Sequence, residues 1–474
     1  MVLENISGTS GIYTRLKPGH CGLSKPKYFK DAPDSPIVRP FSSLLCSTSS
    51  EEISLADRLG GVETVQTVET VRQVTATNSV SGELVVSGNT VYFVSTGGWN
   101  ASFTPIEAAC RRRYQLKDVA LEFFLTSGET HLIVFDSVTT RNSLFAILSR
   151  AGVSGLLKSA NLEVTTKLWR QGHLTNFQYL LELNRLSGRT FNDLMQHPVM
   201  PWILADYTSP HLNLNAATSF RNLRKPIAVQ VAGSEEKYVT NYNILSSDGS
   251  GLGGLMGPYH FASHYSNTGI VLHYLVRVPP YTAEFIRFQD GNFDLPDRSF
   301  HKLATSWLMA SELSASDVKE LIPEFYYLPE MFVNSGGYRL GRLDDGTKVN
   351  DVELPAWAAS PDEFVRINRQ ALESEFVSCQ LHQWCDLIFG YKQRGPEAVR
   401  ATNVFYYLTY EGAVDIEPGM DPVMKEAIEN QVKSFGQTPS QLLLEPHPPS
   451  RSAPHSSPMA STSPPPEEPW VCVM

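Results

Sequence analysis

The sequence predicts an α+β protein in which a meander of short strands, closed by one helix, precedes a larger and mostly helical domain. Two observations lead to this fold class. Between about residue 71 and residue 135, β-branched and aromatic runs alternate with turn residues. Beyond about residue 161, helical apolar spacing is bounded by capping residues, and aromatic segments that contain proline separate the helices. With 42% hydrophobic and 10% aromatic residues, the chain can bury a sizeable core.

The strand pattern predicts a PH-like β-barrel with a C-terminal helix over residues 66–153. Residues 83–87 and 90–94 form a hairpin pattern, because Ser87-Gly88-Asn89 lies between two β-branched runs. Three further strands are expected at residues 112–116, 120–125 and 131–135, and Ser127-Gly128-Glu129 supplies the turn between the last two. The final helix, residues 139–151, has apolar residues at helical spacing: Leu144, Ile147, Leu148 and Ala151.

Residues 161–447 are predicted to form one large domain whose helices have clear ends. Thr175 and Gln178 form a capping box, and Gly188 is a suitable residue for the end of that helix. Ser360 is an N-cap followed by proline at the first helical position, and the apolar spacing behind it predicts one helix that stops near Gly390.

Between these helices, proline denies several apolar segments a regular helix, although their composition predicts burial. These segments are residues 198–207, 279–281, 322–331 and 354–357. A buried irregular backbone needs hydrogen-bond partners, and the side-chain amides of Asn192, Asn222 and Asn267 are candidates.

Both ends of the sequence have the composition of disordered segments. Residues 1–65 are rich in Ser, Pro, Gly and Thr, with one short helix expected at residues 51–59. Residues 448–474 are rich in proline and serine.

Charge and cysteine usage exclude several classes of function. A net charge of -10 argues against nucleic-acid binding by bulk electrostatics. No apolar run reaches the roughly 18 residues of a membrane-spanning helix, so any membrane contact is expected to be peripheral. The six cysteines form no paired framework, which favours the reducing cytosol.

No motif in the sequence predicts an enzyme, a cofactor or a metal. Residues 249–254 match G-x-G-x-x-G, but polar residues precede the match and Pro258 follows it, which predicts a surface loop. Core packing is predicted for Cys379, His382 and Cys385 in the helix behind Ser360, and hydrogen-bonding core positions for His260 and His264. The acidic residues Asp297 and Glu320 are interpreted as structural ion pairs and caps beside Arg298 and Lys319.

Arg111, Arg112 and Arg113 form the concentrated basic cluster of the sequence. Guanidinium groups suit phosphate, so one hypothesis is a phosphoinositide-recognition module at a peripheral membrane. Strand alternation favours the other interpretation, an interdomain ion pair or a solvated strand face, because it sends neighbouring arginines to opposite faces.

Eight ordered segments resemble the BEACH domain of the lysosomal-trafficking-regulator and neurobeachin families, and residues 112–122 resemble the PH-like domain that precedes it. The eight segments are residues 176–180 (NFQYL), 192–196 (NDLMQ), 201–207 (PWILADY), 220–227 (FRNLRKPI), 264–267 (HYSN), 317–325 (DVKELIPEF), 387–393 (LIFGYKQ) and 435–442 (FGQTPSQL).

The resemblance implies a non-enzymatic scaffold or adaptor that regulates vesicle and lysosome-related membrane trafficking through protein partners. It implies a PH-like barrel docked on the BEACH domain, with Arg112 and Glu122 in the contact and Arg111 and Arg113 beside them. Trafficking and signalling proteins are the expected partners, with at most weak phosphoinositide contact. The expected location is cytoplasmic, peripherally associated with endosomal, lysosomal or other vesicle membranes.

Overall fold

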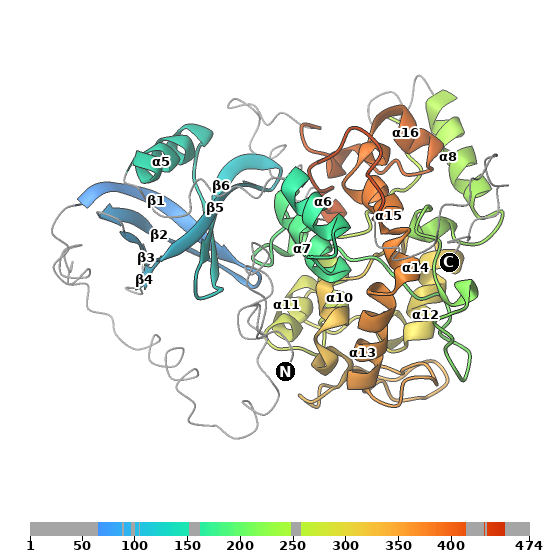
Figure 1. Ribbon diagram of the computed structural model, residues 1–474. Coiled ribbons are helices and arrows are strands. Elements are labelled where there is room, and N and C mark those ends of the chain that lie inside the picture. Colours follow the sequence, from blue (N-terminus) through green and yellow to red (C-terminus); the bar gives the residue numbers. More distant parts are fainter. Residues whose placement is uncertain are drawn as a thin grey trace. The chain divides into compact units, whose positions relative to one another are not determined.

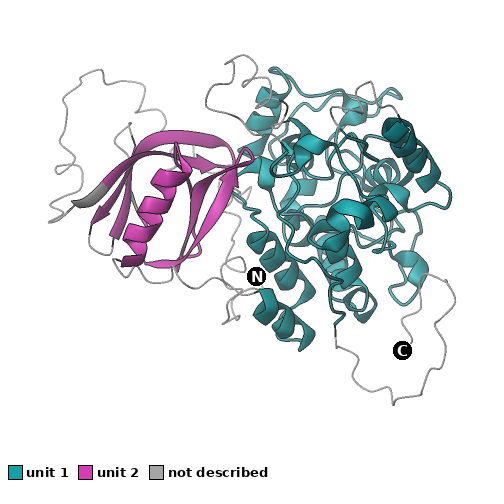
Figure 2. Ribbon diagram, turned by 90° about the horizontal axis from the view of Figure 1, so that it is seen from above, with its two compact units in different colours: residues 1–14, 160–474 teal, residues 15–159 magenta. Residues whose placement is uncertain are grey.

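The computed structural model describes residues 65–87, 90–95, 100–103, 105–150, 162–247, 257–413, 431 and 434–450. The chain divides into two compact units, a smaller one that ends at residue 159 and a larger one that begins at residue 160 (Figure 2). The helix expected at residues 51–59, the glycine-rich loop at residues 249–254 and residues 451–474 lie outside the described residues.

The described residues of the smaller unit form an antiparallel sheet followed by a helix (Figure 1). The strand order is β4-β3-β2-β1-β7-β6-β5. The predicted hairpin is confirmed, since Ser87 of β2 lies opposite Thr90 of β3. The elements are β1 (Val65–Thr75), β2 (Asn78–Ser87), β3 (Thr90–Ser95), β4 (Asn100–Ser102), β5 (Ile106–Tyr114), β6 (Lys117–Leu125), β7 (Thr130–Val134) and α5 (Val138–Arg150).

Sequence patterning missed β1, which pairs with both β2 and β7. Its valines recur at every third position, whereas a strand with one buried face repeats every second residue. Val71 packs in the core on one face of the sheet, while Val74 packs with Ala120 and Leu132 in a second cluster. The pairing partners, rather than the alternation, therefore make this segment a strand.

Helix α5 lies across one face of the sheet, where it is the magenta helix of Figure 2. Leu144 and Leu148, one helical turn apart, belong to the same buried cluster as strand residues such as Leu121 and Phe123. At the start of the helix, buried Arg141 pairs with Asp118 at 2.8 Å, next to the first residue of β6.

The larger unit is mostly helical, and its helices are joined by long extended segments (Figure 1). The predicted capping box is confirmed, because Thr175 accepts from the backbone N–H of Gln178 and the Gln178 side chain accepts from the N–H of Thr175. The helices are α6 (Leu162–Arg170), α7 (Asn176–Leu186), α8 (Glu235–Ser247), α10 (Thr268–Tyr274), α11 (Tyr281–Phe288), α12 (Leu303–Leu308), α13 (Pro361–Leu372), α14 (Glu375–Ser378), α15 (Leu381–Ile388) and α16 (Gly395–Arg400).

The single helix predicted behind Ser360 is wrong, because the structure divides it into α13, α14 and α15. Ser360 is the N-cap of α13 as predicted, with Pro361 at the first position. A second N-cap, Ser374, then accepts from the N–H of Val377 and starts α14. Apolar spacing persists through the breaks because it records which residues are buried, not the continuity of the backbone.

The extended segments are buried as predicted, and side-chain amides satisfy their backbone. The side-chain amide of Asn184 forms two hydrogen bonds with the backbone of Val199. It donates to the carbonyl oxygen at 2.9 Å and accepts from the N–H at 2.8 Å. The side chain of Asn267 caps α10 by accepting from the N–H of Ile270. The side chain of Asn222 accepts from the N–H of Arg224, two residues further on, in a local turn. Sequence patterning missed the other amides in this role: Asn176, Asn184, Gln230, Gln393 and Asn403.

Replacing Gly436 by alanine is expected to destabilise the larger unit by about 2–4 kcal/mol in urea unfolding. Gly436 has φ +86°, and a Cβ there would overlap the carbonyl oxygen of Ser266. The left-handed backbone alone costs roughly 1 kcal/mol for a residue with a side chain, and the clash with a backbone atom adds to it. Gly346 is the matched control, because its φ is +85° and nothing lies within 4 Å of the added carbon. Equal losses in the two variants would contradict the predicted clash.

Candidate functional site

The basic cluster on β5 divides between the two faces of its strand, as strand alternation predicts. The exposed Arg111 lies over the ring of Phe145 in α5, with 5.1 Å between guanidinium carbon and ring centroid. Arg112 points to the other face, where its Nε donates to Glu122 Oε2 at 2.6 Å. Arg113 is half-buried. The structure therefore brings together Arg112 and Glu122 and separates both from Arg111.

The register of β5 and β6 explains the ion pair between Arg112 and Glu122. Cys110 lies opposite Glu122 and Arg112 lies opposite Ala120, so Arg112 and Glu122 are diagonal neighbours on one face. The two side chains are 3% and 1% exposed. A buried carboxylate balances the charge of Arg112, which leaves the cluster with less positive charge to offer a phosphate group.

A buried ionic centre around Glu320 is the most highly connected carboxylate site described in the larger unit. Arg221 grips the carboxylate with both terminal nitrogens, at 2.6 and 2.7 Å. The indole N–H of Trp384 donates to the same group at 3.2 Å, and the backbone N–H of Trp202 at 3.3 Å. These four donors occupy about as many sites as a carboxylate offers.

The prediction that Glu320 forms a structural ion pair is confirmed, but the predicted partner, Lys319, is wrong. Lys319 pairs with Asp317, whereas Glu320 pairs with Arg221, 99 positions earlier in the chain. Neighbouring side chains of an extended segment point to opposite sides, so adjacent residues do not face each other. Among the described residues, Asp297 forms no ion pair with Arg298, and its carboxylate instead accepts a long hydrogen bond, 3.5 Å, from the backbone N–H of Asp344.

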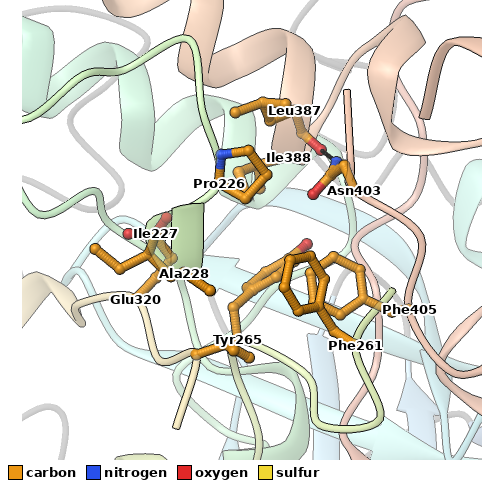
Figure 3. Close-up of a pocket in the computed structure, with 11 residues that line it drawn as sticks. Pro226, Ile227, Ala228, Phe261, Tyr265, Glu320, Leu387, Ile388, Asn403 and Phe405 are labelled. Atoms are coloured by element: carbon orange, nitrogen blue, oxygen red, sulfur yellow. Dashed lines mark hydrogen bonds between the residues drawn. The ribbon is translucent and has the colours of Figure 1, made fainter. Parts of the chain in front are cut away.

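A small cavity lies beside Glu320 and is lined largely by apolar and aromatic side chains (Figure 3). On its wall, Asn403 donates to the carbonyl oxygen of Leu387 at 2.9 Å (Figure 3). The cavity measures about 10 Å³, which is close to the least volume that can hold one water molecule. It therefore has no room for a nucleotide, a sugar or a lipid headgroup.

Two further buried networks tie the extended segments together. His197 and Glu324, both fully buried, lie 3.1 Å apart between Nε2 and Oε1. The buried Arg189 donates to the backbone carbonyls of Met195, His197 and Gln437. Burial lowers the pKa of Arg189 to about 10, so its guanidinium stays charged at neutral pH. Arg189 therefore holds the backbone of three positions with its charged group.

His260 and His264 are hydrogen-bonding core residues, as predicted. His260 Nδ1 accepts from the N–H of Val404 at 3.1 Å, and its ring stacks on Tyr242. His264 Nδ1 lies 2.8 Å from the carbonyl oxygen of Ser266 and 3.2 Å from its backbone nitrogen. Burial lowers the pKa of His260 to about 4 and that of His264 to about 3. Both rings are therefore neutral at pH 7.

The break between α14 and α15 separates Cys379 from His382 and Cys385. Cys379 is the C-cap residue of α14, whereas His382 and Cys385 belong to α15. Cys385 is fully buried, and burial raises the pKa of its thiol well above the usual range, so core packing is confirmed for it. In the part of the chain that the structure describes, no three His, Cys, Asp or Glu residues converge as a metal site.

An antiparallel sheet with one covering helix, joined to a helical unit built on buried extended segments, defines a PH-like domain followed by a BEACH domain. The Beige/BEACH domain matches residues 167–450, and the PH domain associated with Beige/BEACH matches residues 96–149. Because the first match covers more than half of the chain, the protein belongs to the Beige/BEACH family. The resemblance seen in the eight sequence segments is confirmed.

Curated relatives place the chain near two branches of this family. It is 40% identical to the lysosomal-trafficking regulator of Drosophila melanogaster over 97% of the chain, and 42% identical to that of Homo sapiens over 87%. It is 47% identical over 75% of its length to a putative neurobeachin homolog of Caenorhabditis briggsae. The chain spans only 12–14% of the length of these relatives.

None of the helices in the described ranges has both the length and the apolar character to cross a bilayer.

Proposed function

We propose that this chain is a non-enzymatic scaffold or adaptor that regulates vesicle and lysosome-related membrane trafficking through a protein-interaction surface of its PH-like and BEACH domains. The observation that carries the proposal is the saturated Glu320 centre, whose four donors leave the carboxylate no free lone pair with which to accept a proton from a substrate. The names of the relatives, lysosomal-trafficking regulators, support the process.

A cellular experiment tests this proposal. Expressing the chain in cells should change the size or number of lysosome-related vesicles. The change should be lost when Arg112→Ala with Glu122→Ala removes the buried ion pair that positions the neighbouring arginines. Purified chain should not turn over phosphoinositides or nucleotides. Turnover of either compound class that one polar substitution abolishes would contradict the scaffold function.

We propose further that Arg112 and Glu122, with Arg111 and Arg113 beside them, support a contact between the PH-like domain and the BEACH domain. The ion pair fixes the diagonal register of β5 and β6, and so holds the strand that carries the other two arginines. In this proposal Arg111 and Arg113 form part of the contact surface, and Arg112 acts by positioning them.

Replacing Arg112 by alanine is expected to destabilise the smaller unit by about 3–5 kcal/mol, because the carboxylate of Glu122 remains buried without its charged partner. In calorimetry, the intact chain should unfold in one transition if the domains are docked, and Arg112→Ala should split it into two. Arg150→Ala is the control, because Arg150 is an exposed residue at the end of α5, outside the four residues of the proposed contact, and should leave a single transition. Two independent transitions in the unaltered chain would contradict docking.

A phosphoinositide-recognition module acting through Arg111–Arg113 is the competing function, and the exposed Arg111 is the feature that favours it. The pairing of Arg112 with Glu122 weighs against it, because phosphate would have to displace a buried carboxylate. Sedimentation with phosphoinositide liposomes separates the two functions. Weak binding that Arg112→Ala leaves unchanged supports the scaffold, whereas strong binding lost in Arg111→Ala supports lipid recognition.

A further inference from the structure

Three tyrosines and a phenylalanine from separate parts of the chain form an aromatic cluster in the larger unit. Tyr406 is central: its ring centroid lies 5.6 Å from that of Tyr259, 4.9 Å from that of Tyr407 and 4.7 Å from that of Phe435. All four side chains are half-buried, so each ring keeps part of its surface in solvent. We call these four residues the tyrosine surface.

The backbone beneath the tyrosine surface is fixed by hydrogen bonds. The N–H of Tyr406 donates to the carbonyl of Phe261 at 3.0 Å, and its carbonyl accepts from the N–H of Thr409 at 3.0 Å. The Asn241 side chain donates to the carbonyl of Tyr259 at 3.2 Å. Rings on a braced backbone lose little conformational freedom on binding, which favours affinity.

The chemistry of the tyrosine surface suits a proline-rich segment. Its members are aromatic and uncharged, and half-exposed tyrosines offer a flat apolar face together with a hydroxyl. Proline-rich segments adopt the polyproline II helix, whose backbone carbonyls have no internal partner and whose rings pack on aromatic residues. None of these four side chains carries a charge, so binding rests on packing against the rings and on hydrogen bonds to the tyrosine hydroxyls.

The same chain carries such a segment beyond the described residues. Residues 458–469 contain Pro458, three consecutive prolines at 464–466, and Pro469. The last described residue is Ser450, and the 14 residues to Pro464 span about 43 Å at roughly 3.1 Å per residue in an extended proline-rich chain. A domain of this size has a radius of gyration of about 20 Å and a width of roughly 50 Å, so a span of about 43 Å covers most of that width.

We propose that the tyrosine surface binds the proline-rich residues 458–469 of its own chain. The bound tail covers the tyrosines. This inference goes beyond the scaffold function, and its failure would leave that function untouched.

A fluorescein-labelled peptide of residues 456–471 tests the proposal by fluorescence anisotropy. The host is the full chain with Pro464, Pro465 and Pro466 replaced by alanine, so that its own tail does not compete. Saturable binding is expected, and Tyr406→Ala in the host should weaken it at least about tenfold, because the central ring contacts the other three. The unaltered chain, with its tail intact, should bind the peptide several-fold more weakly than the host.

Tyr391→Ala is the matched control, because Tyr391 is a half-buried tyrosine outside the tyrosine surface and should leave binding unchanged. Tyr259→Ala provides a second test in case Tyr406→Ala unfolds, which thermal melting of each variant reveals. Equal binding of a peptide with alanine in place of its prolines would overturn the proposal, as would full binding by both tyrosine variants. Absence of competition by the intact tail would overturn the assignment of the occupant.

Discussion

Replacing Glu320 by glutamine is expected to lower the free energy of unfolding of the larger unit by about 3–5 kcal/mol. Arg221 and Glu320 have side chains that are 0% and 2% exposed. Removing one charge leaves the other buried without its partner, which is far more destabilising than the net contribution of the intact pair. Glutamine keeps the shape of the side chain, so the loss reports the charge rather than a cavity.

Urea unfolding of the variant and of a matched control measures this loss. The control is Glu353→Gln, whose partner Lys302 is also charged but whose side chain is 63% exposed. Exposed pairs contribute about 0–1 kcal/mol, so this control should stay close to the unaltered chain. Combining Glu320→Gln with Arg221→Met should recover part of the loss, because no unpaired charge remains. If Glu320→Gln alone lowered the free energy of unfolding by less than about 1 kcal/mol, the prediction that Glu320 and Arg221 are a pair shielded from water would be contradicted.

Acid is expected to destabilise the protein steeply between about pH 6.5 and pH 4. Burial lowers the pKa of His264 to about 3 and that of His447 to about 4. The unfolded chain takes up protons on these rings below pH 6.5, whereas the folded chain does not until its lower pKa is reached. Stability is therefore lost as pH falls. At 1.36 kcal/mol per pKa unit, each ring contributes on the order of 3 kcal/mol.

His131, His260 and His382 act in the same direction, because burial lowers the pKa of each to about 4. Asp386 acts against them. Burial raises the pKa of its carboxyl to about 6, so the folded chain holds a proton that the unfolded chain releases, and stability falls as pH rises from about 4 to 6. Burial also raises the pKa of Asp193 and of Glu284, so these carboxyls act with Asp386. The shifted histidines outnumber the shifted carboxyls, and net destabilisation by acid is expected.

Urea unfolding at intervals between pH 4 and pH 7 measures the slope of unfolding free energy against pH. A positive slope corresponding to net uptake of more than one proton is expected on unfolding. His211→Gln is the control, because His211 is exposed and its loss should not alter the slope. A flat or negative slope would show that the buried histidines are not held neutral by the fold.

Asp386 and His447 also show how the end of the domain is held. The N–H of His447 donates to Asp386 at 2.9 Å, and the ring of His447 contacts the Tyr179 hydroxyl at 2.5 Å. Arg170 donates to the carbonyl of Pro449 at 3.0 Å. Residues in the first two helices of the larger unit therefore anchor the segment that leads to the proline-rich tail.

The sequence by itself determined the features whose hydrogen-bond partners lie within a few residues. Thr175 and Gln178 cap each other across three positions, and Ser360 caps α13 by accepting from the N–H of Glu363. Local geometry also explains the pairing of β2 with β3 in a hairpin. It explains equally why Arg111 and Arg112 point to opposite faces of their strand. Eight ordered segments were enough to identify the family.

Only the tertiary structure decided which distant groups meet. Glu320 contacts Arg221 and Trp384, and His197 contacts Glu324. These contacts form because segments far apart in the chain lie side by side. A buried charge in an apolar stretch signals that a partner exists, but its position in the sequence carries no information about which partner it is. The reason is physical: the cost of an unpaired buried charge is set by the whole fold, whereas caps and turns are satisfied locally.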